Sequence, residues 1–481
     1  MSAGGPAPAT RNDGELSQFV KISWGVGGLG ATSMLYLINM FVVFFLVRHV
    51  GVSAAIAGIL FAATRVYDAV IDPSIGSLGD RTRSRWGRRR PWMLVGSVLA
   101  PLACIAVFMP PALEPGPALY GVVVVTLLAY CTAYSLFSIP YMAQGTELTD
   151  HYGERASLMA WRTFFIYASG IVITAGAPAL IARLGGDRAA YGTMSIAAAV
   201  VVGASMLWVV AFAGPERASH RAPPRALPAL ATLRTVVSNR PFVIILLTKM
   251  TLQLGTAFTG AAMLFFMTYV IKRAEGGLSE LSLVSNVVGV AVVPIWNKVL
   301  RVVERRPLCI ALFIAQGLTY GSWLLATPDE SRILFDLRAA LIGGLGSGGV
   351  LLAMTMLADT IEYDRLRTGE RREGLFVGAF ELMQKTSFIV GPLITGLAFS
   401  AAGLVAGQAG SANQLPAALD MMRIAVAVIP VCCAIGGVAL MLSYRLDSAT
   451  PTGCARARSR CSLMYHELER ARCLPLASAA A

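Results

Sequence analysis

The sequence predicts an all-α membrane protein that crosses the bilayer twelve times, in two halves of six helices. Hydrophobic residues make up 56% of the 481 positions and charged residues only 14%, and the mean hydropathy is +0.65. That balance is too apolar for a soluble globular domain. The charged residues also gather in short loops between apolar runs, and those runs reach the roughly 20 residues that a spanning helix needs.

Twelve apolar segments can be placed along the chain. The first six cover residues 22–47, 54–79, 92–112, 118–142, 158–183 and 191–213. The second six cover residues 242–271, 278–298, 308–326, 337–357, 375–402 and 420–443. Proline and glycine predict breaks in the fourth, eighth and eleventh helices, at Pro140, Pro294 and Gly391–Pro392. Two sets of six helices joined by a connector are typical of transporters with a central cavity.

These segments divide the chain into five parts. We expect a cytoplasmic N-terminal segment at 1–21, an N-terminal bundle at 22–213 and a cytoplasmic linker at 214–241. A C-terminal bundle follows at 242–443, and the polar, basic tail at 444–481 is expected to be cytoplasmic and disordered. We expect the whole chain to act as a monomer.

The basic residues predict the orientation of the helices. They lie mainly in four alternate loops, which contain Arg81–Arg90, Arg217–Arg240, Lys298–Arg306 and Arg365–Arg372. Basic loops stay on the cytoplasmic side, so we expect both termini to be cytoplasmic and the protein to lie in the cytoplasmic (inner) membrane. The net charge of +13 therefore reflects topology, and no nucleic-acid partner is expected.

Nothing in the apolar segments predicts an enzyme. The four histidines fall in loops or in the tail, and the eight cysteines have no zinc-ligand spacing. No nucleophile–base arrangement or phosphate-binding loop is present within the spans. We therefore expect no catalytic residue and no cofactor, apart from a coupling ion, Na⁺ or H⁺.

The stretch from Phe61 to Gly96 carries the strongest functional signal. Asp68 and Asp72 are four residues apart, so they share one face of the second helix, and Arg65 can reach Asp68. Ionisable side chains at this depth normally face a cavity and handle ions or substrate. Two carboxylates against one arginine predict a cation site, although a structural salt bridge or a shared proton would also account for the pattern.

Other polar side chains recur at depth. Tyr134, Ser135 and Ser138 lie close together in the fourth helix, and hydroxyls beside the carboxylate pair could complete a site for Na⁺. Arg162 begins the fifth helix, as a snorkelling anchor or a substrate contact. Lys385 lies about ten residues inside the eleventh segment, so we expect it to balance the acidic pair or to contact the solute.

Two motifs support a family resemblance. RVYDAVIDPSIGSLGDRTRSRWGRRRPWML in the second helix, and LADTIEYDRLRTGERREGLFVGAFELMQKTSFIVG from the tenth helix into the eleventh, resemble the glycoside–pentoside–hexuronide cation symporters. These form the melibiose-permease branch of the major facilitator superfamily. The resemblance implies that Asp68, Asp72 and Ser135 bind the cation. It also implies that Arg65, Tyr134, Arg162 and Lys385 line the solute site.

The chain departs from that family where the sugar is bound. Thr32 replaces an acidic residue of the first helix, Ser138 replaces an aspartate, and Met142 replaces a tryptophan that stacks on the sugar. We therefore assign these three positions to the substrate site but do not expect a melibiose-like galactoside. Methionine offers no flat ring, and hydroxyls accept sugar hydrogen bonds less strongly than carboxylates.

The sequence thus predicts a secondary transporter in which a monovalent cation and a small solute, expected to be a carbohydrate, cross the bilayer together by alternating access. A glycoside, pentoside or hexuronide is the first interpretation. A lysolipid or other amphiphile is the second, and a transport-inactive sensor is a third.

Overall fold

The computed structural model describes residues 16–82, 84–149, 152–214, 239–368, 373–407 and 414–444. Within these ranges it is entirely helical, with no strand, and the expected all-α class is confirmed. The expected linker at 214–241 and tail at 444–481 lie almost wholly outside the described residues. The same holds for most of the N-terminal segment at 1–21.

The N-terminal half contains six spans. The first combines α1 (Gln18–Gly25), α2 (Gly27–Phe45) and a π-helical segment at Leu46–Val50. The fifth combines α6 (Tyr152–Ser169), a π-helical segment at Gly170–Gly176 and α7 (Ala177–Arg183). The other four are single helices: α3 (Ala54–Arg81), α4 (Arg90–Phe108), α5 (Pro117–Glu147) and α8 (Arg188–Phe212).

The C-terminal half repeats this plan. Its single helices are α10 (Arg240–Tyr269), α13 (Arg305–Gly321), α14 (Arg332–Thr368) and α15 (Glu373–Ala401). Two spans are composite. One joins α11 (Ala274–Ala291) to α12 (Val293–Val302), and the other joins α16 (Pro416–Arg423) through Ile424–Val428 to α17 (Ile429–Leu442).

Eleven helices in the described chain are long and apolar enough to cross a membrane, and the bent pair α11–α12 makes a twelfth. The expected number of spans is therefore confirmed, although α14 runs past both ends of the predicted segment at 337–357.

The expected breaks were partly wrong. α5 and α15 continue through Pro140 and Pro392, because neighbouring helices in a bundle can support a helix that lacks one backbone hydrogen bond. The span with Pro294 is interrupted between α11 and α12, which meet at a bend of 48°.

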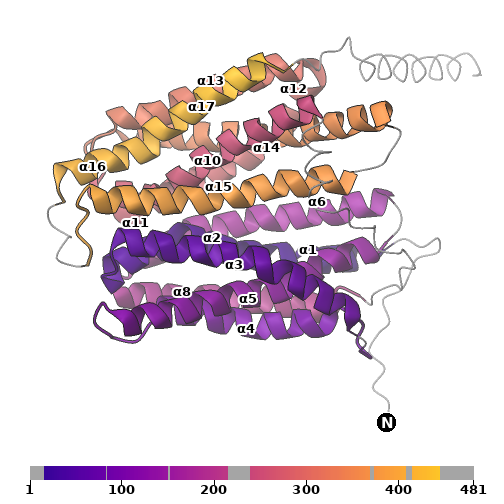
Figure 1. Cartoon of the computed structure of the whole chain (residues 1–481), viewed down its shortest axis with the longest axis horizontal. Helices are drawn as coiled ribbons and strands as arrows, with labels where there is room; N and C mark the ends of the chain where they lie inside the picture. Colours follow the sequence, from indigo (N-terminus) through magenta and orange to yellow (C-terminus); the bar gives the residue numbers. More distant parts are fainter. Residues whose placement is uncertain are drawn as a thin grey trace, which may run out of the picture.

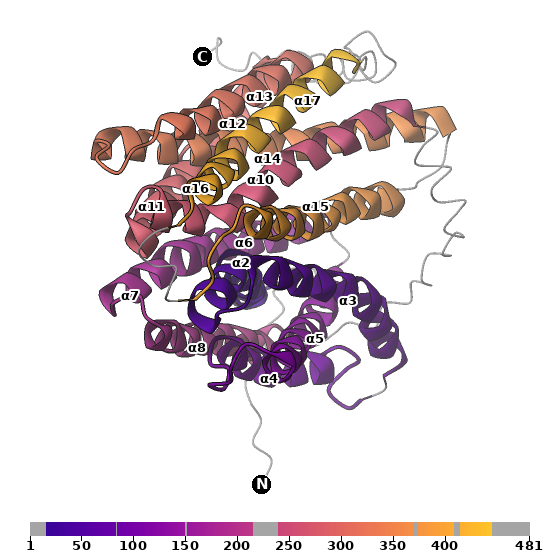
Figure 2. The same cartoon turned by 60° about the vertical axis from the view of Figure 1, so that its left-hand side comes forward.

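The two halves lie side by side as two layers (Figures 1 and 2). The main helix pairs that join them are α3 with α15, α2 with α10, and α11 with both α7 and Gly170–Gly176. We call the end of the molecule with Arg81, Arg90, Arg240 and Arg305 the basic end, and the other the closed end. The basic end lies to the right in Figure 1.

Polar contacts join the halves toward the closed end. The Tyr191 hydroxyl donates to Glu275 Oε1 at 3.0 Å, and Asn286 Nδ2 donates to Thr174 Oγ1 at 3.0 Å. Ser279 Oγ donates to the Ala175 carbonyl oxygen at 2.7 Å. Each of these bonds pairs one residue of the N-terminal half with one of the C-terminal half, so they hold this end shut.

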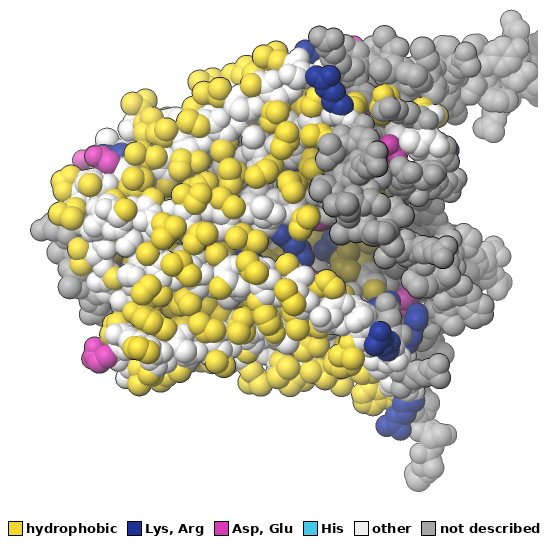
Figure 3. Space-filling view, in the orientation of Figure 1, with side chains coloured by type: hydrophobic (Ala, Val, Ile, Leu, Met, Phe, Trp, Pro, Cys, Tyr) yellow, Lys and Arg dark blue, Asp and Glu magenta, His cyan; other side chains and the backbone are white. Residues whose placement is uncertain are grey.

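Three ion pairs between described residues near the basic end each lie within one half. Lys21 pairs with Glu154, Arg89 with Glu147, and Arg305 with Asp359. Figure 3 shows a hollow between the halves that runs toward this end, with basic side chains (dark blue) inside it. Among the described residues, the direct hydrogen bonds between the halves therefore gather at the closed end, and the hollow lies on the side of the basic end (Figure 3).

The crossing of α3 and α15 gives a test of this packing. A Cβ atom at Gly396 would overlap the Ala54 carbonyl oxygen and lie 3.1 Å from the Gly58 Cα, whereas a Cβ at Gly378 of the same helix would meet nothing within 4 Å. Overpacking of this kind costs about 1–3 kcal/mol. We expect Gly396→Val to lower the thermal midpoint of the detergent-purified protein by roughly 2–6 °C. Gly378→Val is the matched control, and equal midpoints for the two variants would contradict the close crossing.

Candidate functional site

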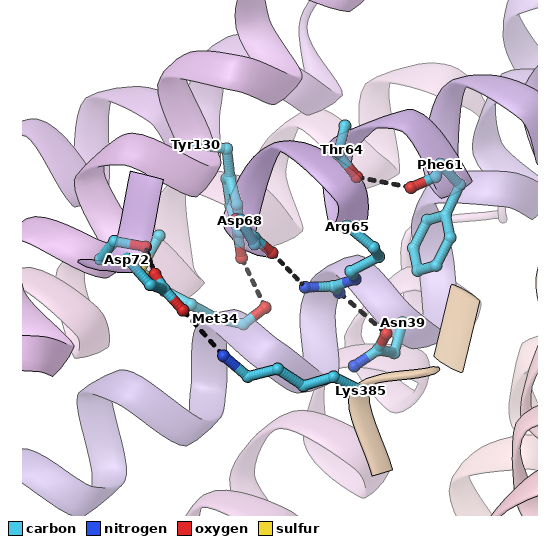
Figure 4. Close-up of polar contacts among 10 residues, drawn as sticks. Met34, Asn39, Phe61, Thr64, Arg65, Asp68, Asp72, Tyr130 and Lys385 are labelled. Carbon is cyan, nitrogen blue, oxygen red and sulfur yellow. Dashed lines mark hydrogen bonds and ion pairs between the residues drawn. The ribbon is translucent and has the colours of Figure 1, made fainter. Parts of the chain in front are cut away.

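The paired aspartates lie on the face of α3 that is turned toward the centre of the molecule (Figure 4). Asp68 is buried, at 8% exposure. Its Oδ2 atom accepts a hydrogen bond from Arg65 Nη1 at 3.1 Å, and Arg65 Nη2 donates to Asn39 Oδ1 of α2 at 2.9 Å. The guanidinium also lies 5.0 Å from the centroid of the Phe61 ring. Arg65 is therefore fixed on three sides and neutralises one carboxylate of the pair.

The second carboxylate is bound by both halves of the protein. Ser135 Oγ of α5 donates to Asp72 Oδ1 at 2.6 Å, and Lys385 Nζ of α15 donates to Asp72 Oδ2 at 2.8 Å. The lysine side chain is 57% exposed and the aspartate 14%. Asp72 thus joins α3, α5 and α15, and its ion pair with Lys385 crosses between the halves (Figure 4).

Two positive and two negative side chains make the centre of the site neutral: Arg65 and Lys385 against Asp68 and Asp72. One oxygen remains unused, because Asp68 Oδ1 is buried and accepts no hydrogen bond from the described residues. Carboxylate and hydroxyl oxygens are ligands for hard cations, and the unused oxygen together with Asp72 and Ser135 suits an ion such as Na⁺. Within the described residues, no group of three or more His, Cys, Asp or Glu side chains could hold a metal ion.

Tyr134 and Ser138 lie beside this centre on α5. The Tyr134 side chain is close to Ser138 and within electrostatic reach of Asp72, Arg65 and Lys385. The structure therefore brings together seven of the ten predicted site residues: Arg65, Asp68, Asp72, Tyr134, Ser135, Ser138 and Lys385.

The other three predicted residues belong to the N-terminal half, and no hydrogen bond or ion pair joins them to the aspartates among the described residues. Arg162 of α6 packs against Gly28 of α2 and interacts with Tyr141, and its Nε atom is buried without a hydrogen-bond partner in the described chain. Thr32 is half-buried one turn after Gly28. Met142 is half-buried against the apolar core. These three assignments stay predictions, as do the roles assigned to the other seven.

The sequence analysis missed Asn39, whose side chain holds Arg65 in place. The signal was a single amide in an otherwise apolar part of the first span, LYLINMFVVFF. A second missed contact fixes the helix pairing, because the Tyr130 hydroxyl of α5 donates to the Met34 carbonyl oxygen of α2 at 2.6 Å. These bonds hold α2, α3 and α5 in register around the aspartates.

Comparisons with known proteins agree with this architecture. The chain is 27% identical to the putative glycoside/cation symporter YagG of Escherichia coli, over 97% of this chain and 99% of that protein. It is 26% identical to an isoprimeverose transporter of Lactiplantibacillus pentosus, over 90% and 89% of the two chains. Among solved structures, the nucleoside transporter NupG has the same fold, with a TM-score of 0.61 at 12% identity over 88% of this chain and 98% of that one.

A family model described as MFS/sugar transport protein matches residues 23–448, which cover both bundles and the segment between them. With its twelve spans, its two six-helix halves and that match, the chain is a multi-pass membrane transporter of the MFS/sugar transport protein family, as the resemblance to the glycoside–pentoside–hexuronide symporters implied.

Proposed function

We propose that this transporter couples the movement of a monovalent cation, Na⁺ or H⁺, to that of a small carbohydrate solute, by alternating access. The observation that carries the proposal is the ion pair between Asp72 and Lys385, which links the two halves at the paired-aspartate site. Ionisable groups at mid-membrane depth are costly, and they normally serve an ion or substrate path.

The geometry supports competition between the cation and Lys385. Ser135 donates to one oxygen of Asp72 and Lys385 to the other. An ion that binds between Asp68 and Asp72 would neutralise the negative charge that holds the ammonium group and would repel that group, so the two compete electrostatically. A proton on Asp72 would have the same effect, because a neutral carboxyl group no longer holds the lysine. Either ion would therefore break an electrostatic link between the halves. Na⁺ would be held by Asp68, Asp72 and Ser135.

The solute would bind next to the cation. Tyr134 and Ser138 offer hydroxyl groups close to Asp72, and Arg162 offers an Nε–H group that has no partner within the described residues. Such groups suit a polyhydroxylated solute, and an arginine also suits a sugar acid. Relatives carry names that fit this class, including the isoprimeverose transporter and a glucuronide carrier protein homolog of Escherichia coli. Thr32 and Met142 would shape the rest of the solute-binding surface.

The membrane placement is part of the proposal. The basic end would face the cytoplasm, because positively charged loops are retained there. Both termini, the linker at 214–241 and the tail at 444–481 would then be cytoplasmic. One relative is named an inner membrane symporter, YicJ of Escherichia coli, and this chain is 27% identical to it. The proposed functional unit is the monomer.

The first test is solute accumulation by proteoliposomes. We expect an inward Na⁺ or proton gradient to drive uptake of at least one radiolabelled probe among isoprimeverose, lactose and methyl glucuronide, with lysophosphatidylcholine as the amphiphile arm. Asp72→Asn should reduce accumulation by at least tenfold, because it removes the negative charge that the ion neutralises. Asp420→Asn changes a carboxylate with 65% side-chain exposure on α16 and serves as the control. Gradient-independent uptake by the native protein would contradict cation coupling.

The second test separates exchange from net transport. Lys385→Gln removes the competitor for Asp72, so the cation should bind more tightly, by about tenfold or more. The ion-free carrier would then retain uncompensated negative charge and would cross slowly between its two states. We therefore expect solute exchange to continue while net uptake falls. Lys298→Gln, at an exposed position of α12, is the matched control. Equal loss of exchange and net uptake would show that Lys385 serves only folding or solute binding.

A further inference from the structure

The mechanism proposed above leaves Lys385 without a partner once the cation is bound. The ammonium group makes one ion pair in the described chain, to Asp72, and that pair must open when the ion arrives. A charged lysine inside the membrane is costly without a counter-charge or water. Water can reach Lys385, whose side chain is 57% exposed, but a second acceptor within reach of the same side chain would restore the lost ion pair.

We propose that Glu381 is this second acceptor, so that Lys385 alternates between Asp72 in the cation-free state and Glu381 in the cation-bound state. The inference rests on the proposed cation coupling. It assigns a positioning role to a glutamate that is not among the ligands of the cation.

The geometry of α15 supports this assignment. Glu381 precedes Lys385 by four residues in one continuous helix, Glu373–Ala401. Side chains with this spacing are neighbours on one helix face, and a glutamate placed before a lysine is the more favourable order. Lys385 reaches toward α3, so the same face directs Glu381 toward the space between the halves. Glu381 is exposed, which leaves its carboxylate accessible to a displaced ammonium group.

A further charged residue, Lys249, lies within electrostatic reach of Glu381. Lys249 of α10 is buried, at 8% exposure, and its Nζ atom lies 3.7 Å from the centroid of the Phe380 ring. Glu381 is the charged residue that acts on it electrostatically. An aromatic face and a nearby carboxylate both stabilise a buried ammonium group. Glu381 thus already interacts with one ammonium group of the C-terminal half, and its exposed side chain is accessible to a second, that of Lys385.

The charges alternate from the N-terminal half into the C-terminal half in the order Asp72, Lys385, Glu381 and Lys249. In the cation-free state Lys385 bridges the halves, whereas after transfer to Glu381 it belongs to α15 alone. Cation binding would therefore remove a link between the halves without creating an unpaired lysine. Ion binding would in this way allow the two halves to move relative to each other.

The test measures cation binding without the solute. The full-length protein in detergent is titrated with NaCl at constant ionic strength, balanced by choline chloride, and separately titrated with acid in choline chloride. The thermal midpoint reports binding. We expect Glu381→Gln to weaken the apparent affinity for the responding ion by about two- to fivefold, since the bound state loses one ion pair. Glu381→Asp, which keeps the charge on a shorter side chain, should lie between Glu381→Gln and the native protein.

Two further variants make the result specific. Glu362→Gln removes the same charge from a half-buried position of α14 that pairs with Arg365, and it should leave the affinity unchanged. In a Lys385→Gln background, Glu381→Gln should have no further effect, because the two residues act as a pair. A loss that persists in that background would show that Glu381 acts on the cation directly and would overturn the proposal.

The remaining outcomes separate this inference from the function on which it rests. If the native protein responds to Na⁺ or to protons but Glu381→Gln matches it, Glu381 is not the second partner and cation coupling stands. If the native protein responds to neither ion, cation coupling fails, and the inference fails with it.

Discussion

The ion pair between Asp72 and Lys385 is the constraint on which the rest of the structure depends. It joins residues 313 positions apart in the sequence, from helices that belong to different halves. Either charge alone inside the membrane would be unfavourable, because an ionised group there needs a counter-charge or water. The side-chain exposures of 14% for Asp72 and 57% for Lys385 place the pair at the boundary between packed protein and the open hollow. It is therefore both stable and accessible to a competing ion.

The contacts between the two halves are concentrated at the closed end, so the halves are less restrained relative to each other near the basic end. Close backbone contact at Gly396 and Gly58 and the bond between Tyr191 and Glu275 hold the closed end. Near the basic end, ion pairs such as that of Lys21 with Glu154 bind helices within one half. In the proposed cycle of alternating access, each half would therefore tilt as one unit. A state open at the other end must break the bond of Tyr191 with Glu275 and expose both side chains to the solvent that enters there.

Much of the fold could be predicted because membrane helices obey local rules. The length of the apolar runs predicted the twelve spans. The four-residue spacing of Asp68 and Asp72 predicted that both side chains share one helix face, without any knowledge of tertiary contacts. The contact of Lys385 with Asp72 could not be derived from spacing, because it depends on how the two halves pack. Asn39 was missed since one amide in an apolar run has no periodic signal. The continuous paths of α5 and α15 past Pro140 and Pro392 were also missed, because support from neighbouring helices is a tertiary effect.

In the proposed mechanism, the arrangement on α5 would let an ion and a solute influence each other without sharing ligands. Ser135 contacts Asp72 directly, while Tyr134, one residue earlier, lies beside Ser138 and within electrostatic reach of the same carboxylate. Any ion that draws Asp72 away from Lys385 therefore changes the field at the Tyr134 hydroxyl. A solute hydrogen-bonded there would bind differently to the two states, and reciprocity requires that it change the ion affinity by the same factor.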